Sequence, residues 1–146
     1  MLIYIVIPAY NEEANLEQTV LAWQRIVNRL GKGSKLLVID DGSQDGSWLL
    51  LHSLEEKCPD LVCLKQTNQG HGAACRAAYL YALQQKADYV FQADADNQIY
   101  PEEFWQFWHQ RQDYDLVIGQ RIARQDGLGR WLVSLALKVC LGLLGG

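Results

Sequence analysis

Short apolar runs alternate with amphipathic segments along most of this chain. The apolar runs occupy residues 2–7, 35–39, 61–64, 89–93 and 116–118. Continuous apolar runs are typical of strands that are covered on both faces. The segments between them predict helices over residues 11–30, 45–57, 73–86 and 101–111. This alternation predicts an α/β fold with a mainly parallel sheet, in which ligands bind at the carboxyl ends of the strands.

The composition indicates one globular domain and excludes several other classes of protein. The chain has 146 residues, 49% of them hydrophobic, and a formal net charge of −4. An acidic chain is not expected to bind nucleic acid nonspecifically. The four cysteines form no CxxC pair, so we expect reduced thiols in a cytoplasmic protein. Residues 1–8 lack a basic segment and a cleavage site, so they predict a strand and not a signal peptide.

Polar motifs follow the first two predicted strands. After the first strand, Tyr10 is placed to stack on a base while Glu12 reads its edge; alternatively, Asn11 simply caps the next helix. The second strand ends in the adjacent acids Asp40 and Asp41, whose like charges repel each other. Capping explains only part of the sequence DDGSQDGS at residues 40–47, so a binding site is the favoured interpretation.

A glycine-rich loop follows the third predicted strand. Gly70 and its neighbours suit either a phosphate loop at a helix N-terminus or a close approach of helix to sheet. Arg76, on the first turn of that helix, is the charged group expected to face a diphosphate. The dinucleotide motif GxGxxG is absent because position 75 is Cys.

The fourth predicted strand ends in an oxygen-rich sequence, DADNQ. Asp94 and Asp96 are alternate residues of an extended segment, so their side chains share a face. With the amide oxygen of Gln98 they form a hard ligand set that suits Mg²⁺ or Mn²⁺, although an Asx-rich turn is the alternative. Arg121, after the fifth run, lies either in a phosphate site or in a solvated loop.

Five sequences occur in the order and spacing typical of family 2 glycosyltransferases: PAYNEE, VIDDGSQDGS, NQGHGAACR, DADNQ and GQR. Within that family the chain most resembles the branch that acts on polyprenyl phosphates, which includes the dolichyl-phosphate mannose synthases. The resemblance covers about residues 3–121. Two positions depart from the family pattern: His71 stands where Lys is often found, and Ala78 stands where Gly is often found.

The resemblance implies a GT-A fold, which is a Rossmann-like three-layer α/β/α sandwich that binds a nucleoside-diphosphate sugar. In such enzymes the first motif cradles the nucleoside, and the residue matching Asp40 contacts the base or ribose. The expected donor-site residues are Pro8, Ala9, Tyr10, Glu12, Asp40, Asp41, Gly70, Arg76, Asp94 and Ala95. The expected ligands of the divalent metal are Asp94, Asp96 and Gln98. Asp96 and Arg121 are the expected catalytic residues.

The resemblance therefore predicts a hexosyltransferase that moves a sugar, with inversion, from a UDP- or GDP-linked donor to an acceptor. A polyprenyl phosphate is the favoured acceptor, because such a phosphate needs no general base and no base is evident in the sequence. One alternative is a catalytically incomplete module that binds nucleotide sugars. Another is a haloacid dehalogenase-like phosphatase, but its acidic motif would follow the first strand and not the fourth.

The C-terminal residues are expected to form an additional helix. Residues 1–121 are expected to form the nucleotide-sugar-binding domain, and residues 122–146 an apolar helix of the same domain. A truncation at the C-terminal end of the fold is part of the same expectation. This mildly basic helix would lie on the cytoplasmic face of a membrane, pack on the sheet, or contact a second subunit in a homodimer.

Overall fold

The computed structural model describes residues 1–95 and 100–119. Its first compact unit, Met1–Trp108, contains a four-stranded sheet. The strands are β1 (Ile3–Ala9), β2 (Lys35–Asp40), β3 (Leu61–Lys65) and β4 (Tyr89–Gln92). They lie in the order β3-β2-β1-β4, and each neighbouring pair is parallel. The parallel α/β fold predicted from the alternating pattern is therefore confirmed.

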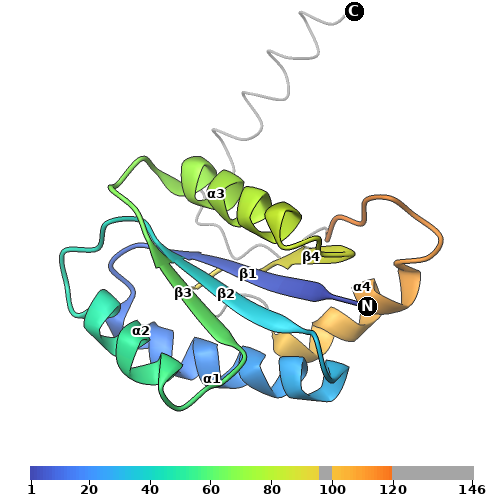
Figure 1. Cartoon of the computed structure of the whole chain (residues 1–146), viewed down its shortest axis with the longest axis horizontal. Coiled ribbons are helices and arrows are strands. Elements are labelled where there is room, and N and C mark those ends of the chain that lie inside the picture. Colours follow the sequence, from blue (N-terminus) through green and yellow to red (C-terminus); the bar gives the residue numbers. More distant parts are fainter. Residues whose placement is uncertain (96–99, 120–146) are drawn as a thin grey trace, which may run out of the picture. The chain divides into compact units, whose positions relative to one another are not determined.

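Helices cover both faces of this sheet (Figure 1). The helices are α1 (Glu13–Leu30), α2 (Ser47–Glu55), α3 (His71–Gln84) and α4 (Phe104–Gln110), with a short 3-10 helix, η1, at Pro101–Glu103. In Figure 1, α3 lies on one face of the sheet, and α1, α2 and α4 lie on the other. The arrangement forms the three layers that the sequence predicts, although each predicted helix differs from the observed one by up to a few residues at its ends.

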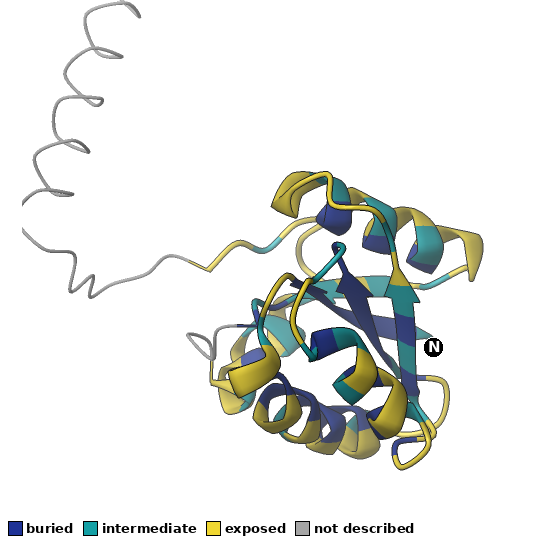
Figure 2. Ribbon diagram, turned by 90° about the vertical axis from the view of Figure 1, so that its left-hand side faces the viewer, coloured by how far each residue is buried: buried dark blue, intermediate teal, exposed yellow. Residues whose placement is uncertain are grey.

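The side chains of β1 alternate between two buried cores. Ile3, Ile5 and Ile7 belong to the core under α1, α2 and α4, and Tyr4 and Val6 belong to the core under α3. All seven residues of β1 are buried, as a continuous apolar run predicts for a central strand. Figure 2 shows the buried residues concentrated in the sheet and on the helix sides that face it.

Small residues let α3 lie close to the sheet. Ala74, Ala78 and Ala82 recur at intervals of four, so they share one face of the helix, and all three are completely buried. They pack in the same core as Tyr4 and Val6. The alanine-rich composition that predicts this helix thus also explains its close packing.

The predicted strand at residues 116–118 is wrong. The structure describes no regular element there, and the side chains of Leu116 and Ile118 are 75% and 78% exposed. Because a strand depends on backbone hydrogen bonds to a neighbour, three apolar residues alone do not specify one. Within residues 1–95 and 100–119, no helix has both the length and the apolar composition needed to cross a bilayer. The predicted helix at residues 122–146 lies outside the described residues.

Candidate functional site

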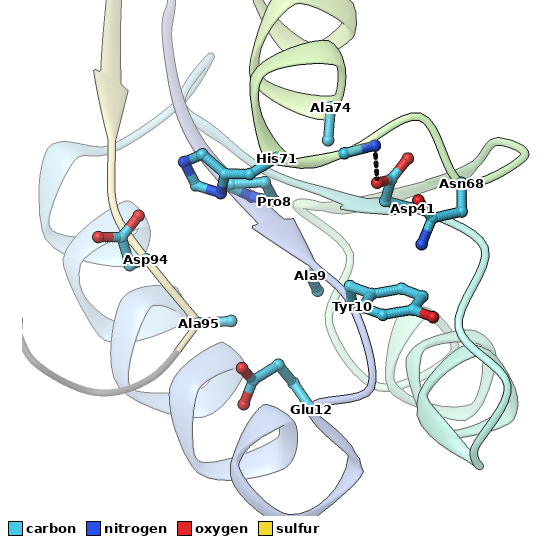
Figure 3. Close-up of a pocket in the computed structure, with 11 residues that line it drawn as sticks. Pro8, Ala9, Tyr10, Glu12, Asp41, Asn68, His71, Ala74, Asp94 and Ala95 are labelled. Carbon is cyan, nitrogen blue, oxygen red and sulfur yellow. Dashed lines mark hydrogen bonds between the residues drawn. The ribbon is translucent and has the colours of Figure 1, made fainter.

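A pocket of about 500 Å³ opens at the carboxyl ends of β1, β2 and β4. This volume is within the usual range of small-molecule sites, and the position is the one expected for a ligand of a parallel sheet. In Figure 3, Glu12 and Asp94 flank Ala95 on one wall, whereas Tyr10 and Asn68 lie toward the other. The lining residues are Pro8, Ala9, Tyr10, Glu12, Asp41, Asn68, Gly70, His71, Ala74, Asp94 and Ala95.

Asp41 connects this pocket to the glycine-rich loop before α3. Its side chain is buried, and Oδ1 accepts hydrogen bonds from Gln66 Nε2 at 2.6 Å and from the Gln69 N–H at 3.0 Å. Oδ2 accepts a third bond, from the Gly70 N–H at 2.8 Å (Figure 3). Gly42 also packs tightly against this loop, because a Cβ there would lie 2.7 Å from the backbone nitrogen of Asn68. The Asp41 carboxylate therefore fixes the loop that contributes several pocket residues.

Asp40 lies beside Asp41 in sequence but has different partners. Its side chain is completely buried and is not among the residues that line the pocket. Oδ1 accepts a hydrogen bond from the Ser43 N–H at 3.3 Å, and Lys65 Nζ lies 3.8 Å from Oδ2. Successive residues of an extended segment face opposite sides, so the side chains of the two adjacent acids are directed away from each other. This arrangement removes most of the repulsion that made the adjacent acids unusual in the sequence.

The segment before α2 caps the start of α1. The Asn11 N–H donates to Ser43 Oγ at 2.9 Å, and the Glu12 N–H donates to Ser47 Oγ at 3.0 Å. In return, Asn11 Oδ1 accepts a bond from the Gln44 N–H at 2.8 Å. Asn11 has a φ of 54° and does not cap α1, whose N-cap is Glu12. The alternative in which Asn11 is the N-cap is therefore wrong, and the serine hydroxyls instead accept from the backbone N–H groups just before α1.

His71, Cys75 and Asp94 are close together beside the pocket. His71 begins α3, and its Nε2 lies 3.4 Å from Cys75 Sγ. Burial, together with the negative charge of Asp94, raises the pKa of the Cys75 thiol. Figure 3 shows the His71 ring between α3 and Asp94. The thiol is consequently protonated at neutral pH, and the ionisable groups that line this part of the pocket are an imidazole and a carboxylate.

The structure brings together most, but not all, of the predicted donor-site residues. Arg76 is exposed on α3 and does not line the pocket, and Asp40 lies beneath its surface. The metal ligands Asp96 and Gln98 and the catalytic residue Arg121 lie outside the described residues. Within the described ranges, no group of three His, Cys, Asp or Glu side chains is placed to hold a metal ion. Asp94 is therefore the predicted metal ligand that the structure places at the pocket.

Three residues that line the pocket, Asn68, His71 and Ala74, were not chosen as site residues from the sequence. All three belong to the quoted sequence NQGHGAACR, in which His71 was noted only as a departure from the family pattern. Their position directly after the third strand was the available signal, because the carboxyl ends of parallel strands meet at one edge of the sheet.

Comparisons with known proteins agree with this geometry. The sequence model described as Glycosyl transferase family 2 matches residues 4–139. A protein of Pseudomonas paraeruginosa (strain DSM 24068 / PA7), named undecaprenyl-phosphate 4-deoxy-4-formamido-L-arabinose transferase, is 34% identical over 97% of this chain and 43% of its own length. A protein of the same name from Aeromonas hydrophila is 35% identical over 94% of this chain and 41% of its own length. The chain thus spans less than half the length of these relatives.

Two solved structures share the fold at low sequence identity. S. aureus TarS in complex with UDP-GlcNAc has a TM-score of 0.58 and 20% identity, over 85% of this chain and 37% of the TarS chain. The mannosyltransferase PcManGT from Pyrobaculum calidifontis, in complex with GDP-Man and Mn²⁺, has a TM-score of 0.52 and 23% identity. That match covers 64% of this chain and 27% of PcManGT.

Proposed function

The chain belongs to glycosyl transferase family 2, and from this membership we propose that its pocket binds a nucleoside-diphosphate sugar for transfer to a polyprenyl phosphate. The observation that carries the proposal is the pocket itself, where residues of the PAYNEE sequence meet Asp94 at the carboxyl ends of the strands. Support also comes from the printed names of the relatives, which are undecaprenyl-phosphate transferases, and from the UDP-GlcNAc and GDP-Man complexes of the structural neighbours.

The pocket residues suit separate parts of such a donor. Tyr10 is 42% exposed and lines the pocket, so its ring is available to stack on the base, and Pro8 and Ala9 provide the backbone beside it. We assign Asp94, with Asp96 and Gln98, to a Mn²⁺ or Mg²⁺ ion, because carboxylate and amide oxygens are the preferred ligands of these ions. When bound, that metal neutralises charge on the departing diphosphate. We assign Arg121 to the stabilisation of the same negative charge.

The proposed acceptor explains why the site needs no evident general base. A phosphate monoester has a second pKa near ~6, so at neutral pH it is mostly a dianion that already carries a nucleophilic oxygen. A hydroxyl acceptor would instead have to lose a proton during the reaction. The undecaprenyl-phosphate transferase names of the relatives support the same class of acceptor. A membrane surface is then the place where the acceptor is met.

Donor binding is tested first, by thermal denaturation of the chain with UDP, GDP and their sugars, each with and without Mn²⁺. We expect one nucleotide to raise the melting temperature in a metal-dependent way. Asp94→Asn should remove the metal-dependent part, whereas Asp60→Asn, which alters an exposed ion pair with Lys35, should not. If no nucleotide stabilises the wild-type chain at any metal concentration, the proposal is wrong.

Transfer is tested separately, with undecaprenyl phosphate in detergent and the sugar of the nucleotide that binds. Formation of a lipid-linked sugar that EDTA prevents would support the complete proposal. Metal-dependent binding without any transfer would favour the alternative of a nucleotide-sugar-binding module.

A further inference from the structure

Glu13 and the segment before α2 exchange two hydrogen bonds. The Glu13 N–H donates to Asp45 Oδ2 at 3.2 Å, and Glu13 Oε2 accepts a bond from the Gly46 N–H at 2.8 Å. The fit at Gly46 leaves no space for a side chain, because a Cβ there would lie 2.4 Å from Glu13 Oε1. The carboxylate of Glu13 therefore rests directly on the backbone of Gly46.

This contact lies next to a part of the pocket wall that belongs to no helix or strand. Tyr10 and Glu12 line the pocket and flank Asn11, whose φ of 54° is unusual for a residue with a side chain. Residues 10–12 belong to neither β1 nor α1. Their orientation depends on β1 at one end, on the hydrogen bonds that Asn11 and Glu12 make with residues 43–47, and on the first turn of α1. Glu13 is the first residue of that helix.

Glu13 does not line the pocket, although its neighbour Glu12 does. Its carboxylate joins the first turn of α1 to a segment more than 30 residues away in sequence. Hydrogen bonds in which one partner is ionised are among the stronger ones in proteins. A group in this position can restrict the pocket wall without touching a ligand.

We propose that Glu13 is a positioning residue for donor binding. By accepting the hydrogen bond from the Gly46 N–H, its carboxylate holds Tyr10 and Glu12 in the orientation that receives the nucleoside. The inference rests on the proposed function of the same pocket. It assigns a role to the second acid of the PAYNEE sequence, for which the sequence indicated none.

Three variants separate the hydrogen bond from the charge. Glu13→Ala removes the acceptor. Gly46→Ala keeps Glu13 but displaces its carboxylate, which is the flexible end of a side chain, while the φ of −74° at Gly46 is compatible with alanine. Glu13→Gln retains an amide oxygen that can accept the same bond without the charge. Glu17→Ala is the matched control, because Glu17 is an exposed acid one turn further along α1.

The measurement is calorimetric affinity of the full chain for UDP and for GDP with Mn²⁺, at a temperature where circular dichroism shows every variant folded. We expect Glu13→Ala and Gly46→Ala each to weaken binding by about five- to tenfold, and Glu13→Gln and Glu17→Ala by less than about twofold. A purely structural role would lower the melting temperature and leave these affinities unchanged.

Each other outcome overturns a defined part of the argument. If Glu13→Ala and Gly46→Ala bind as tightly as the wild type, Glu13 does not position the pocket. If Glu13→Gln binds as weakly as Glu13→Ala, the charge and not the hydrogen bond is responsible, and the role assigned to Gly46 is wrong. If the wild-type chain binds neither nucleotide, the proposed function fails, and this inference fails with it.

Discussion

Replacing Asp41 with alanine should destabilise the fold far more than replacing an exposed aspartate. The Asp41 side chain is buried, and its two oxygens accept three hydrogen bonds, from Gln66, Gln69 and Gly70. The variant removes both acceptor oxygens, and with them all three hydrogen bonds, at once. It therefore releases the loop before α3 from the end of β2.

The magnitude follows from the type and surroundings of these bonds. A hydrogen bond to a charged group contributes about 1.5–3 kcal/mol, and such contributions within one network do not add fully. Gln69 and Gly70 are exposed residues whose bonds to Asp41 are only partly buried, so solvent should reduce the loss. We expect the free energy of unfolding to fall by about 3 kcal/mol, which for a domain of this size lowers the melting temperature by about 10 °C.

The assay is urea unfolding followed by circular dichroism, with Asp60→Ala as the control. Asp60 forms an ion pair with Lys35 at 2.8 Å, and its side chain is 38% exposed, so its loss should cost at most about 1 kcal/mol. Asp41→Asn keeps one carbonyl oxygen and should be intermediate between the wild type and Asp41→Ala. If Asp41→Ala is no less stable than Asp60→Ala, the three bonds do not hold the loop, and our account of the pocket wall is wrong.

Three further predictions concern single side chains. Burial raises the pKa of the Asp45 carboxyl, but hydrogen bonds from Ser47 and Glu13 lower it more, so the pKa lies below its usual ~3.9. The stability that the ionised carboxylate provides should therefore be lost as the pH falls below that value, and Asp45→Asn should remove this part of the acid-unfolding curve. Phe104 is 1% exposed and contacts three other aromatic rings. Phe104→Ala should therefore lower the free energy of unfolding in urea by about 3–5 kcal/mol, and a decrease below about 1 kcal/mol would contradict this packing. Burial and the nearby Glu55 carboxylate raise the pKa of the Cys63 thiol, so Cys63 should react with a disulfide reagent only after unfolding, and rapid labelling of the folded chain would refute its burial.

Much of the fold could be predicted from the sequence because its signals are local. The run that forms β1 is apolar at nearly every position, which is typical of a central strand with helices on both faces. Likewise, Leu16, Val20, Trp23 and Val27 recur at helical spacing, and all four are buried on α1. In contrast, the segment at residues 116–118 contains apolar residues without any signal for a neighbouring strand, and it forms none among the described residues.

The candidate site was predictable to the extent that its position depends on strand ends. Tyr10 and Asp94 follow β1 and β4, which are neighbours in a parallel sheet, so the fold alone brings them to one edge. Arg76 was expected to face a diphosphate because the sequence places it near the start of a helix. In the structure it is the sixth residue of α3, is exposed and is not among the residues that line this pocket, so its role stays a prediction.

The acids of DDGSQDGS show why the remaining roles could not be assigned from sequence. Asp41 binds a loop 25–29 residues further along the chain, and Asp45 binds the start of α1 more than 30 residues earlier. Only Asp40 keeps an oxygen, Oδ2, that is buried without a hydrogen bond to any described residue. Leaving such an atom without a partner costs free energy, and the ion pair with Lys65 offsets part of that cost. Lys65→Met should therefore lower the free energy of unfolding in urea, because it leaves the buried Asp40 carboxylate without its cation.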